Sequence, residues 1–142
     1  MKDGYSAYQT ANIDTADQGK LILIAYDVAI KHCRLALELF SDKKKMEERM
    51  KHIFKVQDAV AELMSALKID VGQIAKNLYR LYEYMNWRLV NASIKQKAEY
   101  IEEVLGYLVD LRAAWKDAIE NLRSQKKVST DNGQPKSIVV SG

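Results

Sequence analysis

The chain has 142 residues, of which 48 % are apolar and 29 % charged, which fits one folded domain and excludes compositional disorder. Its net charge is +3, but residues 125–142 alone carry +2, so the folded part lacks the concentrated positive charge of a nucleic-acid-binding face. The chain has a single cysteine, which predicts a protein without disulfides in a reducing compartment. It has no apolar signal core at its start and no apolar run of about 18 residues, so we expect a soluble cytoplasmic protein without membrane insertion.

One proline and six glycines in such a length favour long helices. Residues 1–14 lack periodicity and are expected to form an N-terminal arm that carries Tyr5 and Tyr8. Thr15 and Gln18 form a capping-box pattern that predicts the start of the first helix. Apolar residues at three- and four-residue spacing then predict four helices, at 16–40, 45–67, 73–94 and 96–124.

Residues 125–142 are rich in Ser, Thr, Asn, Gly and Pro, which predicts a disordered C-terminal tail. The four helices are similar in length and joined by short loops, so consecutive helices should be antiparallel neighbours. The expected fold is therefore all-α, an antiparallel up-down four-helix bundle over residues 15–124 between the arm and the tail.

Two of these helices are more apolar than a bundle requires, since one core-facing stripe is enough. In helix 16–40 a first stripe is assigned to the core and a second one to the surface. In helix 73–94 four apolar side chains likewise fall outside the expected core stripe. The first-helix core stripe is Leu21, Ile24, Val28, Leu35 and Leu39, its surface stripe is Ile22, Tyr26, Ile30, Cys33, Leu37 and Phe40, and the third-helix extras are Tyr79, Trp87, Val90 and Ile94.

Contiguous exposed apolar surface with large aromatic residues usually marks a partner site. Packing of these residues at helix flanks or under the N-terminal arm would also explain them, as would homo-oligomerisation. We find no catalytic constellation. His32 and His52 lie on different helices without acidic partners at metal-ligand spacing, and Cys33 reads as a small buried hydrophobe. No catalytic residue, cofactor or metal is expected, and the chain should not be an enzyme.

Five segments, in the correct order over about residues 5–120, resemble the flagellin export chaperones of the FliS family. Two departures are Thr15-Ala16, where the family often has Ser-Pro, and Val28, where it commonly has Gly; the second affects how closely a partner approaches there. The matching segments are Tyr8-Gln9, the run 23–30 (Leu-Ile-Ala-Tyr-Asp-Val-Ala-Ile), the run 77–85 (Asn-Leu-Tyr-Arg-Leu-Tyr-Glu-Tyr-Met) followed by 88–92 (Arg-Leu-Val-Asn-Ala), and 103–105 with 112–115 in the last helix.

The resemblance implies a cytosolic export chaperone that binds the disordered C-terminal segment of flagellin. It also implies that the chaperone prevents early polymerisation and delivers flagellin to the export gate, and a co-chaperone is a further expected partner. The alternative is a homo-oligomeric structural bundle; the free protein is expected to be a monomer or a weak homodimer. The expected partner-binding residues are Tyr5, Tyr8, Ile22, Tyr26, Ile30, Tyr79, Tyr82, Tyr84, Trp87, Val90 and Ile94, with Tyr5 and Tyr8 acting as a removable cover of the site.

Overall fold

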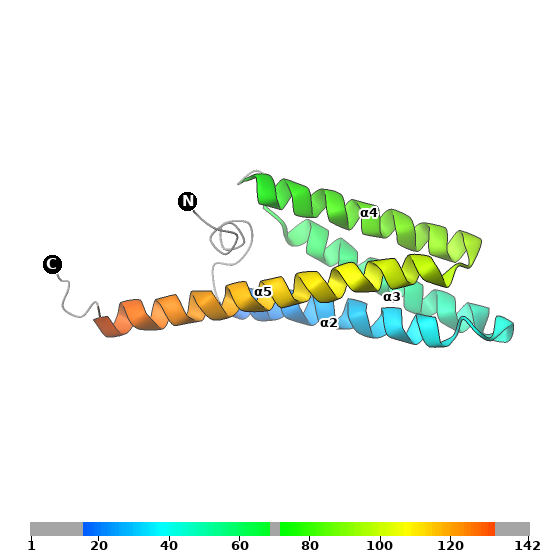
Figure 1. Ribbon diagram of the computed structural model, residues 1–142, viewed down its shortest axis with the longest axis horizontal. Coiled ribbons are helices and arrows are strands. Elements are labelled where there is room, and N and C mark those ends of the chain that lie inside the picture. The colour runs from blue at the N-terminus through cyan, green and yellow to red at the C-terminus, as the bar shows by residue number, and fades with distance from the viewer. Residues whose placement is uncertain (1–15, 69–71, 133–142) are drawn as a thin grey trace.

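The computed structural model describes residues 16–68 and 72–132, and the regular structure in them is helical. Four long helices follow one another, and a short 3₁₀ turn, η1 (Lys43–Lys45), connects the first two (Figure 1). The predicted helix boundaries agree to within about two residues except at the end of the last helix. The helices are α2 (Ala16–Glu38), α3 (Met46–Ala66), α4 (Gln73–Lys95) and α5 (Ala98–Asn132).

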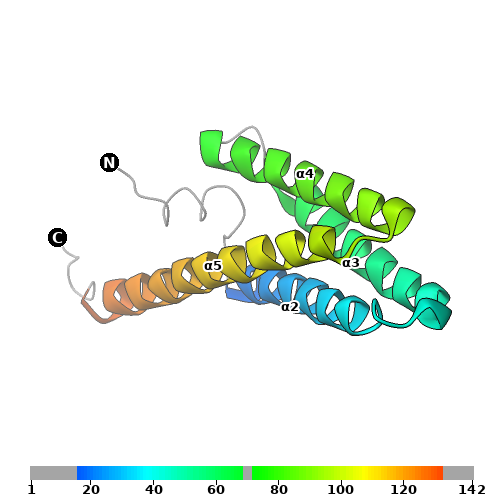
Figure 2. The same cartoon turned by 45° about the vertical axis from the view of Figure 1, so that its right-hand side comes forward.

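The helices pack as a four-membered ring in which α2 contacts α3 and α5, and α4 contacts the same two helices. Consecutive helices run in opposite directions, so the predicted antiparallel four-helix bundle is confirmed (Figures 1 and 2). The last part of α5 projects beyond the ends of the other helices. The predicted boundary of a disordered tail at residue 125 is wrong, because α5 remains helical to Asn132; residues 133–142 lie outside the described residues.

The core explains most of the helix periodicities. In α3 and α5 apolar residues at three- and four-residue spacing are buried, including Ile53 and Val60 of α3 and Val104, Leu108 and Trp115 of α5. In α4 the buried positions recur at three- and four-residue spacing, as a helix with one face against a core requires. They are Ala75, Leu78, Tyr82, Met85, Leu89 and Ala92.

In α2 the prediction of the core face is wrong, because the two stripes are exchanged. Leu21 is 66 % exposed and Ile24 is 46 % exposed, although both were assigned to the core. The stripe assigned to the surface forms the core instead, together with two small residues, Ala29 and Ala36. Small residues on the inner face let a helix approach its neighbours closely, which large side chains on that face would prevent. The buried members of that stripe are Ile22, Tyr26, Ile30 and Cys33.

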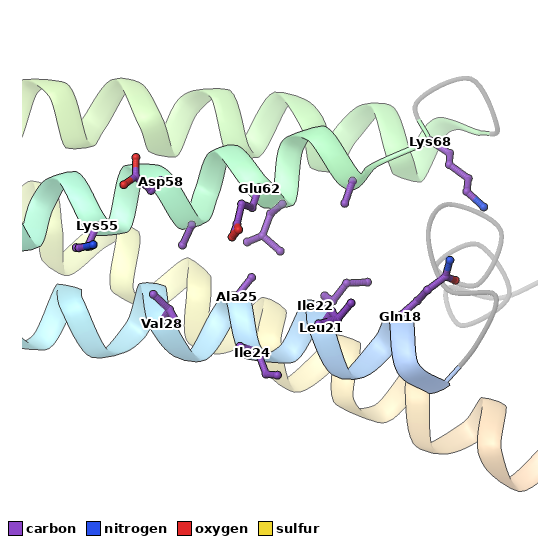
Figure 3. A pocket seen from close by; sticks show the side chains of 13 residues that line it. Gln18, Leu21, Ile22, Ile24, Ala25, Val28, Lys55, Asp58, Glu62 and Lys68 are labelled. Atoms are coloured by element: carbon purple, nitrogen blue, oxygen red, sulfur yellow. The ribbon is translucent and has the colours of Figure 1, made fainter.

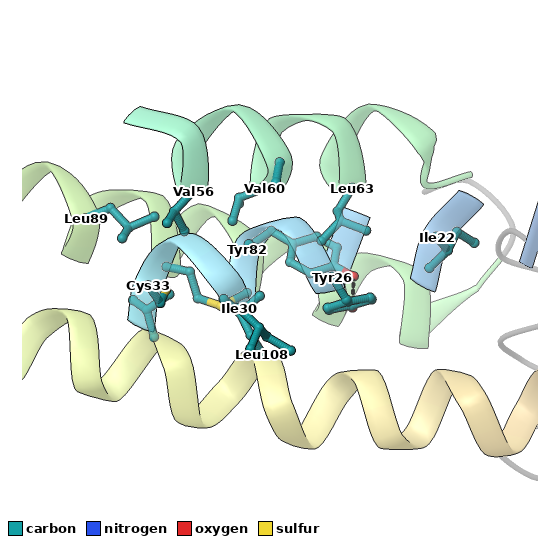
Figure 4. Packing of buried hydrophobic residues seen from close by; sticks show 14 of the residues in the cluster. Ile22, Tyr26, Ile30, Cys33, Val56, Val60, Leu63, Tyr82, Leu89 and Leu108 are labelled. Atoms are coloured by element: carbon teal, nitrogen blue, oxygen red, sulfur yellow. Dashed lines mark hydrogen bonds between the residues drawn. The ribbon is translucent and has the colours of Figure 1, made fainter. Parts of the chain in front are cut away.

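A buried pair of tyrosines joins the two helices at opposite corners of the ring. The hydroxyl of Tyr26 on α2 hydrogen-bonds to that of Tyr82 on α4, deep in the core (Figure 4). Both side chains are almost fully buried, so each hydroxyl needs a partner there. The pair therefore fixes how the two helices face one another across the bundle.

Gly19 sets the distance between α2 and α5. An added Cβ at this buried position would lie 2.8 Å from Cγ1 and 2.9 Å from Cδ1 of Ile119. Those distances are shorter than carbon–carbon contacts allow, so only glycine lets the two helices pack this closely here.

Arg49 ties together both connections at one end of the bundle. Its guanidinium donates to the backbone carbonyls of Leu39 and Asp42 in the α2–α3 connection, and to Oε1 of Gln96 in the α4–α5 connection. The same group lies 4.5 Å above the ring centroid of Phe40. Gln96 has a left-handed backbone conformation, φ 53°, which ends α4. Arg49 is only 4 % exposed, and its charged guanidinium thus finds hydrogen-bond acceptors there without a carboxylate.

Candidate functional site

A groove runs between α2 and α3, with a volume of about 710 Å³ (Figure 3). Its α2 side presents the exposed apolar side chains of Leu21, Ile24 and Val28, and its floor includes the buried residues Ile22 and Leu63. We call this feature the α2–α3 groove. It is lined by Gln18, Leu21, Ile22, Ile24, Ala25, Val28, Lys55, Asp58, Ala59, Glu62, Leu63, Ala66 and Lys68.

The two walls of the groove differ in chemistry. Apart from Gln18 near its start, the α2 wall is apolar, whereas the α3 wall carries the charged side chains of Lys55, Asp58 and Glu62 at successive turns (Figure 3). An amphipathic helix laid along such a groove could bury its apolar stripe against α2 and place polar groups beside α3. The groove thus fits an amphipathic helix better than a fully apolar ligand.

A second surface, the α4–α5 aromatic cluster, lies on the opposite side of the ring. It consists of Tyr84, Trp87 and Arg88 on α4 with Tyr100, Glu103 and Tyr107 on α5. The carboxylate of Glu103 accepts from the Tyr84 hydroxyl at 2.7 Å, from Arg88 Nε at 2.7 Å and from the Tyr107 hydroxyl at 3.2 Å. The guanidinium of Arg88 also lies 3.9 Å above the Tyr100 ring.

These contacts hold the aromatic rings in place and shift the pKa values of the groups that form them. The hydrogen bond from Tyr84 is the main reason why the pKa of Glu103 lies below its usual value, and the same bond raises the pKa of Tyr84. Trp87 remains 55 % exposed, with its ring centroid 6.0 Å from that of Tyr84. The cluster therefore presents a large aromatic side chain on a pre-organised support.

The sequence-predicted site residues fall into three groups. Ile22, Tyr26, Ile30 and Tyr82 are buried, so the prediction that the first three lie on a surface face is wrong; Ile22 still reaches the groove floor. The α4 candidates beyond the core remain accessible, Tyr79 and Val90 in part, and Tyr84, Trp87 and Ile94 as exposed side chains. Tyr5 and Tyr8 lie outside the described residues.

The exposed apolar wall of α2 was missed as a site, although the sequence contains a signal for it. At about 100° per residue, the charges Lys20, Asp27, Lys31 and Arg34 share one side of the helix. The observed core lies opposite that side, whereas Leu21, Ile24 and Val28 lie beside it. An apolar stripe that borders the charged strip is the one left accessible when two stripes compete for the core.

Comparison with known proteins gives one consistent result. The model of the family "Flagellar protein FliS" matches residues 1–122. A flagellar secretion chaperone FliS of Bacillus subtilis (strain 168) is 33 % identical over 126 residues, which cover 89 % of this chain and 93 % of that protein. The chaperone of the same name from Salmonella typhimurium is 32 % identical over 120 residues, covering 80 % of this chain and 87 % of that protein.

A helical bundle with an exposed apolar groove is typical of a protein-binding module. The chain belongs to the FliS family of flagellar secretion chaperones. The resemblance seen in the sequence is thus confirmed over nearly the whole folded part. In the described helices, no segment is long and apolar enough to cross a membrane.

Proposed function

We propose that this chain is a cytoplasmic export chaperone that binds the C-terminal segment of flagellin in the α2–α3 groove, prevents its premature polymerisation and delivers it to the export gate. The observation that supports this most directly is the exposed apolar wall of Leu21, Ile24 and Val28. A bundle gains nothing for its own stability from leaving these three side chains in water. The names of the FliS relatives support a role in flagellar secretion.

The three exposed side chains of the groove supply part of the free energy needed for reversible binding. Covering the exposed fractions of these three side chains should contribute about 2–4.5 kcal/mol, at about 1.5–3 kcal/mol for full burial of each. Further contacts with the α3 wall and with the α4–α5 aromatic cluster would add to this. A partner that must later be released for export suits such a moderate interaction better than a permanent interface.

The partner is proposed to bind as a helix that forms on contact. A segment that is disordered when free folds at the cost of conformational entropy, and apolar burial in the groove offsets that cost. Calorimetry of the full-length chaperone with flagellin should therefore show a negative heat-capacity change. Flagellin without its C-terminal segment should show no binding at micromolar concentrations, and equal binding of both forms would contradict the proposal.

Two valines provide a matched test of the groove. Val28 in the groove is 38 % exposed, and Val109 on α5, outside it, is 39 % exposed. Val28→Ser should weaken flagellin binding several-fold, because it removes apolar contact area and adds a hydroxyl that the partner must desolvate. Val109→Ser should leave binding unchanged. Equal losses from both variants would show that the groove is not the site.

The alternative is a homo-oligomeric structural bundle in which the same apolar wall pairs with a second copy. Sedimentation distinguishes the two, because the chaperone proposal requires a 1:1 complex with flagellin. If Val28→Ser dissociates a stable homo-oligomer and leaves flagellin binding intact, the alternative is correct.

The N-terminal arm with Tyr5 and Tyr8 is proposed to cover the site in the free protein. Deleting residues 1–14 should then preserve or tighten flagellin binding and increase self-association.

A further inference from the structure

His32 on α2 and His52 on α3 face each other across the seam between these helices. Their Nδ1 atoms are 2.8 Å apart, and the two rings stack with centroids 5.1 Å apart and planes inclined by 28°. Both side chains are half-buried. The sequence alone placed them on different helices with no evident partner, whereas the fold makes each the partner of the other. Neither the core nor the α2–α3 groove accounts for this pair.

The protonation state of the pair follows from the contact. A hydrogen bond between two Nδ1 atoms requires a proton on one ring and a lone pair on the other, so two imidazolium ions cannot occupy this arrangement. Burial lowers the pKa of His32, and the charges of His52, Lys31 and Lys55 lower it further. The ring that accepts this hydrogen bond has an unprotonated Nδ1, and an unprotonated imidazole nitrogen is the atom that binds metal ions.

The spacing of the two nitrogens matches that of two ligands on one metal ion. Zinc binds imidazole nitrogen at about 2.0–2.1 Å, so two such nitrogens lie about 2.8–3.4 Å apart at bond angles between about 90° and 110°. The observed 2.8 Å lies at the short end of this range. The ring that donates its Nδ1 proton needs only to carry that proton on Nε2 instead, which leaves both Nδ1 lone pairs available.

The geometry points to a bis-histidine site at which His32 and His52 bind one divalent transition-metal ion of the zinc, nickel and copper type across the α2–α3 seam. Among the described residues no third His, Cys, Asp or Glu converges with a pair of such ligands, so water completes the coordination. The site is therefore open and exchangeable, unlike a closed four-ligand structural zinc site. Cys33, although adjacent in sequence, is buried with its pKa raised to about 12, and its protonated thiol is not a ligand.

The site has a defined position relative to the α2–α3 groove. His32 follows the groove residue Val28 by one helical turn, and His52 precedes the groove residue Lys55 by one turn. A metal ion bound there holds α2 and α3 together just beyond the end of the groove. Binding to the folded state alone must stabilise the bundle, because the unfolded chain does not hold the two rings together.

The test uses the full-length protein with Zn²⁺ alone and Mg²⁺ as the control ion. At a zinc concentration 100 times the dissociation constant, the equilibrium constant for unfolding should fall about 100-fold, and magnesium should have no effect. His52→Gln should abolish the zinc effect, whereas Cys33→Ala should retain it. An effect of zinc that persists in His52→Gln would overturn the inference.

A second measurement needs no variant. The chain contains only two histidines, so its NMR spectrum has only two sets of imidazole ring signals. Both sets should shift or broaden together and saturate at one equivalent of zinc. If either set is unaffected up to millimolar zinc, the two rings do not share an ion and the inference is wrong.

Discussion

Gly19→Ala gives the most direct test of how closely α2 packs on α5. An alanine normally stabilises a helix interior by about 0.5–1 kcal/mol relative to glycine. Here the new methyl group would meet Ile119 at 2.8 Å, and this isoleucine is itself buried, so overpacking should cost about 1–3 kcal/mol. The net effect should be a loss of up to about 2.5 kcal/mol of stability, with a middle value of about 1 kcal/mol. Urea unfolding followed by circular dichroism measures it.

Two controls make the reasoning refutable. Gly106 is exposed on α5, with nothing within 4 Å of an added Cβ, so Gly106→Ala should stabilise by about 0.5–1 kcal/mol. On an Ile119→Ala background, the three atoms that crowd the new methyl are gone, and Gly19→Ala should then stabilise as well. If Gly19→Ala destabilises equally with and without the Ile119 side chain, the close approach of the helices is not the cause.

Three further predictions concern the core and the aromatic cluster. Tyr26→Phe and Tyr82→Phe should each cost about 1–3 kcal/mol of stability, because the other hydroxyl loses a buried hydrogen-bond partner. Measured by thermal unfolding, the double variant should lose less stability than the sum of the two single variants, and strict additivity would contradict this. Trp87→Ala should leave the melting temperature nearly unchanged while weakening flagellin binding by about 2 kcal/mol in calorimetry, and unchanged binding would remove the α4–α5 cluster from the site. Because the pKa of Glu103 is lowered in the folded state, its carboxylate stabilises the bundle above pH 4.5, and this contribution is lost as the pH falls below that value. Glu103→Gln should therefore reduce the loss of stability between neutral and acidic pH. An unchanged dependence of stability on pH in this variant would refute the reasoning.

The fold could be predicted because the evidence for it is local. The apolar spacings of α3 and α5 each contain one dominant stripe, and those stripes are buried as expected. The end of α5 was harder, because residues 125–132 lack large apolar side chains and resemble a tail. They continue the helix to Asn132 although no apolar periodicity marks them. Helix periodicity locates packed faces, and it gives little information where a helix projects beyond its neighbours.

The site could be predicted only in part, because helix α2 carries two apolar stripes. Periodicity alone cannot decide which of two stripes meets the core. Residue size and the position of the charges decide it: Ala29, Cys33 and Ala36 allow close packing, and the charged strip lies opposite them. The contact between His32 and His52 has no local signal at all, because it depends on the register of two antiparallel helices.

The position of Arg49 has a consequence for how the chain folds. Its guanidinium joins the connection within the first helical hairpin to the connection within the second. Neither hairpin alone can satisfy this group, since a hairpin of α2 and α3 lacks Gln96 and a hairpin of α4 and α5 lacks the arginine itself. Burying an arginine without all of its acceptors is costly. The two halves of the chain should therefore unfold as one cooperative unit, and a fragment that ends before α4 should not hold its helices together.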